Sequence, residues 1–308
     1  MTAAGSLTRS YLAVPAHRER FVNNAAGSNA DAIFLDLEDA VPTLEKPSAL
    51  AASIHALANI DWGRKHVAVR VNAVDSSFID SEIEQLAGCD RLDAIIVPKT
   101  EQCYEIEKIA SKFAKRPRVG RRPVALELLI ETALGIVNVD DLASAHEQVQ
   151  ALHFGVGDFA ASIGARSTTV GASPGGYQNV SVDQTIVTTP IDLFAYPMMR
   201  ILVAARSRGL RAIDGPYGDF SNLDASYLSA RKAASMGYDG KQIIHPSQIS
   251  PTHQAFRPAD DELAQAKRIV AAMKEAESKG LGATTVDGKM IDAVNIKMAL
   301  RLLAFGGH

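Results

Sequence analysis

The sequence has little cysteine, only Cys89 and Cys103 in a chain of 308 residues. Their spacing fits neither a metal-binding pair nor a redox pair, so we expect both to be reduced and buried. The chain also lacks a run of about 20 apolar residues, the length that a membrane-spanning helix needs. Its N-terminal segment, MTAAGSLTRS, contains no apolar signal sequence. These absences predict a soluble, cytoplasmic protein that does not act on a membrane.

Charge of one sign does not dominate the chain either. Charged residues make up 22% of it and the formal net charge is -3, so no global positive field recruits nucleic acid or a membrane surface. Any phosphate-bearing ligand must therefore be met by local arginines and lysines. The hydrophobic content of 47% over 308 residues is enough for one large core or two ordinary ones.

Short apolar runs with strand composition recur along most of the chain, with helical patterns between them. They span residues 10–15, 32–38, 66–72, 93–99, 124–131, 151–158, 210–216 and 241–246. Near-continuous apolar strands separated by helices favour a parallel sheet covered on its outside. Eight such strands in about 250 residues predict an α/β fold, a (β/α)8 TIM barrel, with a doubly wound open sheet as the alternative. Polar residues follow many of the runs, which favours the barrel, because barrel active sites lie at the C-terminal strand ends.

The remaining segments are expected to differ from this pattern. Residues 164–190 are rich in Gly, Ser and Thr and should form a long loop, followed by a helix over 191–208. A helix over 260–279, a turn or short hairpin at Asp287-Gly288 and a helix over 291–303 should end the chain. We therefore expect a catalytic barrel, 1–250, and an extension, 251–308, that is too small to fold alone and docks on its own barrel or on a neighbour's.

Two acids stand at the ends of successive strand runs. Glu131 ends VALELLIE and Asp158 ends ALHFGVGD. A carboxylate at the exit of a buried strand is costly without a partner, and two on neighbouring strands can share Mg²⁺, which takes oxygen ligands and keeps several waters. The alternative is that Glu131 caps the start of the next helix and that Asp158 caps the helix that begins with FAASIG. The pairing on successive strands favours the metal site.

Arg70 is a second candidate, because it interrupts the apolar run VAVRVN and would point into the barrel mouth. A guanidinium there needs an anion, either the substrate or an acid of the cluster Asp36, Glu38 and Asp39 on the preceding strand, of which Glu38 and Asp39 are the expected partners. We expect these acids to hold Arg70 or metal-bound water rather than to ligate the metal directly.

Four further residues carry weaker signals. Arg18 and Lys46 lie beside the first two strands and are, from the sequence alone, typical of solvated surface charges. His245 precedes Pro246 at the end of the last strand run, where a histidine more often has a structural role. Asp292, in GKMIDAVNI, is typical of a residue that caps a helix.

Several ordered strings resemble one known superfamily. They are LDLEDAV with Lys46 after it, VRVN, VPK, IET, GVGDFAASIG, IDGPYGDF, IIHPSQI and GKMID. The chain is similar along nearly its whole length to the citrate lyase β-subunit-like (HpcH/HpaI aldolase) superfamily. Within it, IDWGRKHVAVRVN, DRLDAIIVPK, GDFAASIGARSTTVGA and DGPYGDFS most resemble the malyl-CoA/β-methylmalyl-CoA lyase family.

The resemblance implies a TIM barrel that uses Mg²⁺, with Mn²⁺ as a substitute, to cleave a carbon–carbon bond reversibly. The expected reaction converts (S)-malyl-CoA to acetyl-CoA and glyoxylate, and β-methylmalyl-CoA to propionyl-CoA and glyoxylate. Citramalyl-CoA or citryl-CoA lyase, malyl-CoA thioesterase and a CoA-independent hydroxy-diacid aldolase are the alternatives. The resemblance also implies a homo-oligomer, a trimer or hexamer.

The resemblance assigns roles to residues of this chain. Its metal ligands are Glu131 and Asp158, Arg70 binds substrate and takes part in catalysis, and the backbone of Gly157–Asp158 faces the substrate. Around them, the resemblance implies two further groups of residues. Arg18, Ile244 and His245 border the coenzyme A arm, and Glu38, Asp39 and Lys46 support the first group. Asp292 becomes an acid/base carried by an extension that closes, as a lid, over the barrel of an adjacent subunit.

Overall fold

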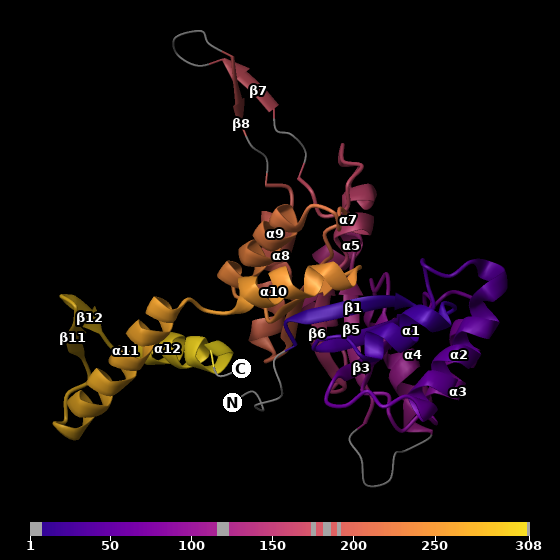
Figure 1. The fold of residues 1–308 in the computed structure, drawn as a ribbon, viewed down its shortest axis with the longest axis horizontal. Coiled ribbons are helices and arrows are strands. Elements are labelled where there is room, and N and C mark those ends of the chain that lie inside the picture. Colours follow the sequence, from indigo (N-terminus) through magenta and orange to yellow (C-terminus); the bar gives the residue numbers. More distant parts are fainter. Residues whose placement is uncertain (1–7, 116–122, 174–176, 181–185, 190–191, 307–308) are drawn as a thin grey trace. The chain divides into compact units, whose positions relative to one another are not determined.

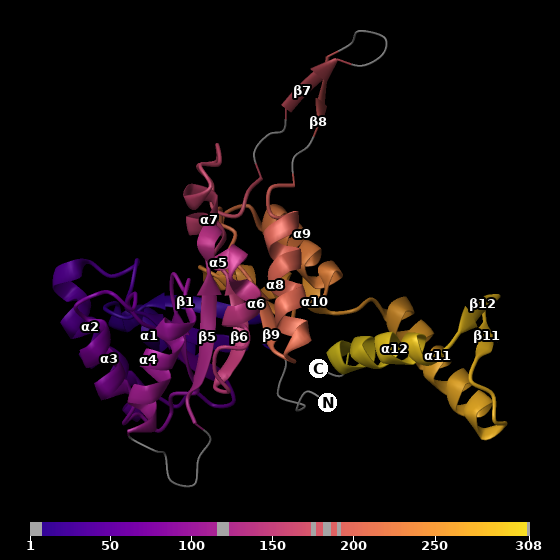
Figure 2. The ribbon, with the colours of Figure 1, turned by 180° about the vertical axis from the view of Figure 1, so that it is seen from behind.

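Eight parallel strands close into a barrel with helices around it (Figures 1 and 2). The computed structural model describes residues 8–115, 123–173, 177–180, 186–189 and 192–306. The barrel strands are β1 (Ser10–Pro15), β2 (Ala32–Asp36), β3 (His66–Arg70), β4 (Ala94–Val97), β5 (Ala125–Ile130), β6 (Val149–Phe154), β9 (Arg211–Asp214) and β10 (Gly240–Ile243). Neighbours in this order pair with each other, and β10 pairs back onto β1. The predicted (β/α)8 barrel is confirmed.

Helices connect the strands and cover the outside of the barrel (Figure 2). They are α1 (Glu19–Ala26), α2 (Lys46–Asn59), α3 (Ile79–Leu86), α4 (Cys103–Ala114), α5 (Ala133–Val137), α6 (Val139–Leu142), α7 (Val156–Ser162), α8 (Ala195–Ser207), α9 (Leu223–Met236) and α10 (Ile249–Phe256), with 3-10 turns η1 (Thr43–Glu45) and η2 (Pro246–Gln248). No helix in the described ranges has both the length and the apolar character needed to cross a membrane.

Both faces of the barrel strands are buried, which explains their near-continuous apolar sequences. Side chains alternate along each strand between the barrel interior and the helical layer. On β2, Ala32 and Phe34 lie in the interior core, whereas Ile33 and Leu35 are fully buried on the other face. Because the alternation continues to the strand end, the next inward position on β2 is Asp36. Counting alternate inward positions along the other strands in the same way places the polar residues at their C-terminal ends at the barrel mouth.

Several boundaries differ from the sequence prediction. The strands end earlier than the apolar runs, because residues such as those at 156–158 already belong to the following helix. The segment expected to be only a long loop contains an antiparallel hairpin of β7 (Tyr177–Val180) and β8 (Ile186–Thr189). The expected burial of the cysteines is also wrong, since Cys89 and Cys103 are free but partly exposed.

The chain divides into two units, Met1–Thr252 and His253–His308. In the second unit, α11 (Asp260–Ser278) packs against α12 (Ala293–Gly306), with the hairpin of β11 (Thr284–Val286) and β12 (Lys289–Ile291) between them in sequence. Met273, Val286 and Ile291 form its small core. The turn at Asp287-Gly288 uses left-handed backbone at both residues, with φ of 50° and 74°.

Candidate active site

The barrel mouth carries a group of charged residues at the C-terminal strand ends. We call it the mouth cluster, and it consists of Asp36, Glu38, Asp39, Arg70, Lys99, Glu131 and Asp158. Strand pairing builds its centre: Asp36 is in register with Arg70, and Ile130 with Phe154. The residues that follow the second pair, Glu131 and Gly155, therefore lie side by side.

Arg70 is held most closely by Asp36, a member of the predicted acidic cluster, and it also pairs with Glu38 and Asp39, as the sequence suggested. Its Nε and Nη2 donate to the two carboxylate oxygens of Asp36, both at 2.7 Å. Nη1 lies 3.1 Å from Glu38 Oε2 and 3.8 Å from Asp39 Oδ2. Burial alone would raise the pKa of Asp36, but the charge and hydrogen bonds of Arg70 outweigh it and the pKa is lowered. The bidentate pair fixes the guanidinium plane and leaves its Nη1 edge to face the cluster.

Asp36 also ties the acidic loop to the strand end. Its carboxylate accepts hydrogen bonds from the backbone N–H groups of Glu38, at 3.0 Å, and Ala40, at 3.2 Å. The loop is thereby folded back so that Glu38 is buried beside Arg70. Burial raises the pKa of Glu38, although Arg70 and Lys99 act in the opposite direction. Glu38 Oε2 is buried and accepts no hydrogen bond from the residues that the structure describes.

Lys99 joins the two sides of the mouth cluster. Its Nζ lies 2.5 Å from Glu38 Oε1 and 3.5 Å from Asp39 Oδ1. Its backbone N–H donates to Glu131 Oε1 at 2.8 Å. The residue has a φ of 49°, in the left-handed region that non-glycine residues seldom adopt.

Glu131 is buried, and its surroundings carry excess negative charge. Burial, and then the charges of Glu38 and Asp158, raise the pKa of Glu131 to about 8. Gly155 makes the space for this side chain, because a Cβ at Gly155 would lie 2.2 Å from Glu131 Cβ and 2.3 Å from its Oε2. A carboxylate pressed against two others in a buried site is a natural place for a cation.

Asp158 lies in the first turn of α7, directly after β6, and is half-buried. Its carboxylate forms no hydrogen bond or ion pair with any residue in the described part of the chain, yet its charge acts on Glu131. The alternative that Asp158 serves as a helix cap is not what the structure shows, since the residue lies inside the helix and the cap position is Gly155.

The chemistry of the mouth cluster fits a divalent cation. All of its acids offer oxygen donors, Glu38 Oε2 lacks a hydrogen-bond donor among described residues, and Glu131 is destabilised as an anion. Among the described residues, no group of three or more His, Cys, Asp or Glu side chains is placed to hold a metal ion. Mg²⁺ can bind through one or two carboxylates while it keeps several waters, and Glu131 and Asp158 are the carboxylates that could provide them.

Lys46 supports the acidic loop from outside the barrel. Its Nζ donates to the carbonyl oxygens of Leu37, at 2.9 Å, and Glu38, at 2.8 Å, and to Asn72 Oδ1 at 2.6 Å. Asn72 is held in turn by the buried carboxylate of Glu82. Lys46 is therefore a structural anchor and not the solvated charge that the sequence alone suggested.

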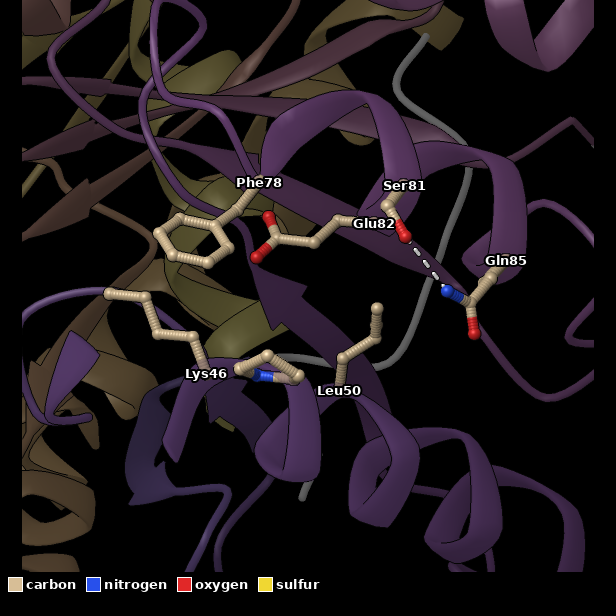
Figure 3. Close-up of a pocket in the computed structure, with 7 residues that line it drawn as sticks. Lys46, Leu50, Phe78, Ser81, Glu82 and Gln85 are labelled. Atoms are coloured by element: carbon tan, nitrogen blue, oxygen red, sulfur yellow. Dashed lines mark hydrogen bonds between the residues drawn. The ribbon is translucent and has the colours of Figure 1, made fainter. Parts of the chain in front are cut away.

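A small cavity of about 100 Å³ lies between α2 and α3, on the far side of Lys46. Figure 3 shows its walls, with Phe78 and Glu82 facing Lys46 and Leu50. It contains neither Glu131 nor Asp158 in its lining, so it is separate from the mouth cluster. Lys46 Nζ also lies 5.9 Å from the centre of the Phe78 ring.

The residues expected to border coenzyme A lie at the same end of the barrel. Arg18 is exposed at the start of α1, and its backbone N–H donates to Pro15 O at the end of β1. Ile244 is 41% exposed, and the His245 ring stacks on Phe220 with centroids 4.7 Å apart. Gly157 lies next to Asp158 in the first turn of α7, so it faces the same mouth.

Asp292 belongs to the second unit, where its carboxylate caps α12. Oδ1 accepts hydrogen bonds from the backbone N–H groups of Val294, at 2.9 Å, and Asn295, at 3.4 Å, and Asn295 Oδ1 accepts from Asp292 N–H. The structural alternative that the sequence offered is therefore realised. A cap accepts through one carboxylate oxygen, and these bonds leave Oδ2 available for other chemistry.

Sequence reasoning did not assign roles to two residues of this site, Gly155 and Lys99. Asp36 was expected to act with its neighbours, and counting inward positions from Ala32 and Phe34 would have singled it out among them. Gly155 could have been found from its register position opposite Glu131. Lys99 carried no such signal. Its contacts with both Glu38 and Glu131 depend on a left-handed backbone conformation, which the presence of a lysine in the sequence does not predict.

A second group of charged residues lies deeper in the barrel, and we call it the inner cluster. It consists of Tyr11, His66, Glu127, His153, Arg211 and Gln242. Glu127 Oε1 lies 3.0 Å from His66 Nε2 and 2.5 Å from Arg211 Nη2, while Oε2 lies 3.0 Å from His153 Nε2. Each oxygen of Glu127 is thus compensated.

Comparison with known proteins adds three findings. A family model described as HpcH/HpaI aldolase/citrate lyase matches residues 9–246. An L-malyl-CoA/beta-methylmalyl-CoA lyase of Cereibacter sphaeroides is 35% identical over 291 residues, covering 92% of this chain and 90% of the relative. A (3S)-malyl-CoA thioesterase of the same species is 32% identical over 296 residues, covering 96% and 93%.

A solved structure is similar over almost the whole chain. The CitE protein of Mycobacterium tuberculosis, in complex with magnesium, acetoacetate and coenzyme A, superposes with a TM-score of 0.76 at 29% sequence identity. The match covers 98% of this chain and 99% of the other.

Proposed function

The chain belongs to the HpcH/HpaI aldolase/citrate lyase family, and we propose that it is a Mg²⁺-dependent lyase that cleaves (S)-malyl-CoA reversibly to acetyl-CoA and glyoxylate. β-Methylmalyl-CoA, which would give propionyl-CoA and glyoxylate, is the proposed second substrate. The relatives named malyl-CoA lyase and the magnesium- and coenzyme A-bound CitE structure support this proposal.

The observation that carries the proposal is the pair Glu131 and Asp158 at the ends of adjacent barrel strands. Glu131 is buried with its pKa raised to about 8, and Asp158 is without a partner in the described chain. These two carboxylates would hold the cation, with waters completing its shell. When bound, Mg²⁺ would supply Lewis acidity towards the oxygens of a 2-oxo or 2-hydroxy acid.

Arg70 would bind and orient the small acid. Its Nε and Nη2 are fixed by Asp36, so Nη1, which lies 3.1 Å from Glu38 Oε2, is held in a set orientation from which it could also donate to a ligand. An aimed donor of this kind is worth about 3–4 kcal/mol when charge develops on the oxygen that it faces. In the cleavage direction the hydroxyl of malyl-CoA loses its proton and becomes the aldehyde of glyoxylate. The electron pair of the broken carbon–carbon bond remains on the thioester fragment as an enolate.

Asp292 would move the proton at the thioester carbon. In the synthetic direction it takes a proton from the methyl group of acetyl-CoA, and in the cleavage direction it returns one to the enolate carbon. We assign this role to Asp292 of a neighbouring copy whose C-terminal unit closes over the barrel. Exposed Val294 and Met298 follow Asp292 on α12 and give that unit an apolar surface suited to docking. Closure would exclude water and protect the enolate.

The coenzyme A arm would lie along Arg18, Ile244 and His245. Arg18 is a local cation at the mouth, which a phosphate-bearing arm needs in a chain of net charge -3. The exposed Phe220–His245 stack adds a flat surface. The backbone of Gly157, one residue before Asp158, would face the acyl group.

A thioesterase is the second candidate function, because a malyl-CoA thioesterase is nearly as similar to the chain as the lyases are. Product analysis separates the two, since a lyase forms acetyl-CoA and glyoxylate whereas a thioesterase forms malate and free coenzyme A. The same assay with citramalyl-CoA or citryl-CoA would detect pyruvate or oxaloacetate. A CoA-independent aldolase would show no affinity for coenzyme A.

Asp292→Asn tests the proton role separately from the metal site. The variant should fold and bind Mg²⁺ as the wild type does, yet lose exchange of the acetyl-CoA methyl protons with deuterium, followed by NMR. Mixing Asp292→Asn with Asp158→Ala chains should restore some activity if Asp292 acts on a neighbouring copy. Exchange that persists in Asp292→Asn would place the base elsewhere.

A further inference from the structure

Lys99 contacts both a proposed metal ligand and a carboxylate that is not one. Its backbone N–H donates to Glu131 Oε1 at 2.8 Å, and its Nζ lies 2.5 Å from Glu38 Oε1. The two donors can diverge in this way because Lys99 adopts a φ of 49°. In the described chain, Asp287, in a hairpin turn, is the other non-glycine residue with positive φ. A left-handed lysine beside a reactive cluster is backbone strain of the kind that collects at functional sites.

Glu38 is close enough to the proposed metal site to compete with substrate for the cation. The acid is buried close to Glu131, and its Oε2 lies 3.1 Å from Arg70 Nη1 without forming a hydrogen bond with the described residues. Because Asp36 already holds Arg70 through Nε and Nη2, Oε2 could exchange this ion pair for a cation held by Glu131 and Asp158. A third carboxylate on the cation would occupy a position that the anionic substrate needs, and would lower the positive charge that attracts it.

We propose that Lys99 is a positioning residue that holds Glu38 away from the cation, so that Glu131 and Asp158 remain its protein ligands and the other coordination positions stay open to substrate. The ammonium retains Glu38 by its ion pair with Oε1, while the backbone N–H of the same residue fixes the orientation of Glu131. The inference deepens the proposed function and rests on its metal site.

The arrangement predicts opposite changes in metal affinity and turnover. Lys99→Met removes a positive charge and frees Glu38 to join the cation, so Mg²⁺ should bind about tenfold more tightly. The same change should lower kcat for malyl-CoA cleavage by about tenfold, because substrate then competes with Glu38 for the cation. A lysine that only maintained the fold would, when removed, weaken binding and turnover together.

Calorimetric titration with Mg²⁺ alone tests the proposal on the full-length chain. The variants are Lys99→Met, Lys99→Arg, which keeps the charge and should return the affinity to within about threefold of the wild type, and Lys112→Met as the matched control. Lys112, on helix α4, forms an ion pair of the same 2.5 Å length with Asp80, on helix α3. Its removal should leave Mg²⁺ affinity and kcat unchanged.

A Glu38→Gln background identifies the route of the effect. In that background no third carboxylate is available, so Lys99→Met should tighten Mg²⁺ binding by only about twofold. This smaller gain would come from the loss of the lysine's positive charge near the cation. Weaker Mg²⁺ binding by Lys99→Met, or an equal factor in both backgrounds, would overturn the proposal. The titration contains no CoA thioester, so a chain that cleaves none can still support the role of Lys99. A wild-type chain without Mg²⁺ affinity would overturn both the metal site and this inference.

Discussion

Two glutamates four residues apart, one within strand β5 and one directly after it, illustrate how this barrel separates stability from chemistry. Glu127 and Glu131 continue the alternation of inward positions along β5, and both are almost completely buried. Yet the pKa of Glu127 is lowered well below its ordinary value, whereas that of Glu131 is raised to about 8. Burial acts in the same direction on both, so the neighbours decide.

The inner cluster compensates its glutamate from every side. Arg211 and His66 reach Oε1 of Glu127, and His153 reaches Oε2. His153 has its pKa lowered by burial, and Gln242 Nε2 lies 2.9 Å from its Nδ1, which fits a neutral ring that donates from Nε2. This closed network ties five strands of the barrel together, β3, β5, β6, β9 and β10, and leaves few unpaired polar groups that could bind a ligand.

In the mouth cluster, by contrast, the negative charges are only partly compensated. Its five carboxylates are met by the cations Arg70 and Lys99, with Lys46 on the backbone behind, and Glu131 faces two further acids. The surplus of negative charge is what a divalent cation would neutralise. The comparison teaches that a buried acid marks a functional site when its partners are missing, not merely because it is buried.

The largest expected effect breaks the mouth cluster. Glu131→Gln keeps the shape of the side chain but removes a proposed metal ligand, so malyl-CoA cleavage should fall by about 1000-fold or more. The free energy of unfolding of the metal-free protein should change by less than about 1 kcal/mol, because the lost carboxylate was destabilised. Steady-state kinetics and urea unfolding measure the two quantities. A Glu131→Gln variant that is still active, or one that is unfolded, would contradict the view that Glu131 serves catalysis whereas Glu127 serves stability.

The reverse result is expected from the inner cluster. Glu127→Gln leaves the partly buried Arg211 and the fully buried His153 without their carboxylate, which should cost about 3 kcal/mol of unfolding free energy. Below its lowered Tm, the folded variant should bind Mg²⁺ as the wild type does. Thermal unfolding and Mg²⁺ titration at low temperature check this. A loss of Mg²⁺ affinity in the folded variant would mean that the two clusters are coupled.

A change at Gly155 should give an intermediate effect on both properties. Gly155→Ala puts a Cβ 2.2 Å from Glu131 Cβ, so the glutamate must move. We expect a destabilisation of about 1–3 kcal/mol and a weaker Mg²⁺ affinity. Gly88→Ala is the control, since its Cβ would lie 3.6 Å from Gln85 O, an ordinary contact. Unchanged Mg²⁺ affinity in Gly155→Ala would show that the Glu131 position does not matter.

The smallest expected effect is on the pH dependence of the unfolding free energy under acidic conditions. The folded pKa of Glu127 lies well below the ordinary value of 4.5 for a glutamate, so its stabilising contribution is present above that pH and is lost as the pH falls towards the folded pKa. Relative to wild type, Glu127→Gln should reduce the acid slope of unfolding free energy by at most about 1.4 kcal/mol per pH unit. Glu107→Gln, an exposed change on α4, is the matched control. Identical slopes for wild type and Glu127→Gln would contradict the compensated state of Glu127.

Local sequence patterns were enough to predict the barrel and much of its mouth. Apolar runs at regular spacing identified all eight strands, because strands buried on both faces need such runs. Arg70, Glu131 and Asp158 stood out because a charge that ends or interrupts an apolar strand is conspicuous. Where these residues act on substrate remains a prediction of the proposed function.

What the sequence did not reveal depends on contacts between distant segments. The sequence did not single out Glu127, because its partners His66 and Arg211 lie 61 and 84 residues away from it in sequence. Asp36 and Arg70 are 34 residues apart, and their pairing follows only from strand register. The contacts of Lys99 could not be predicted either, because they depend on its left-handed backbone conformation. Compensation of charge is a property of the folded arrangement.

The most direct measurement follows the products of (S)-malyl-CoA after the protein has been stripped of metal with chelator. Adding Mg²⁺ to the wild type should start the formation of acetyl-CoA and glyoxylate in equal amounts, and adding it to Asp158→Ala should not. Equal cleavage by the chelated wild type, or malate and free coenzyme A as the products, would contradict the account of a cation held between Glu131 and Asp158 for carbon–carbon cleavage.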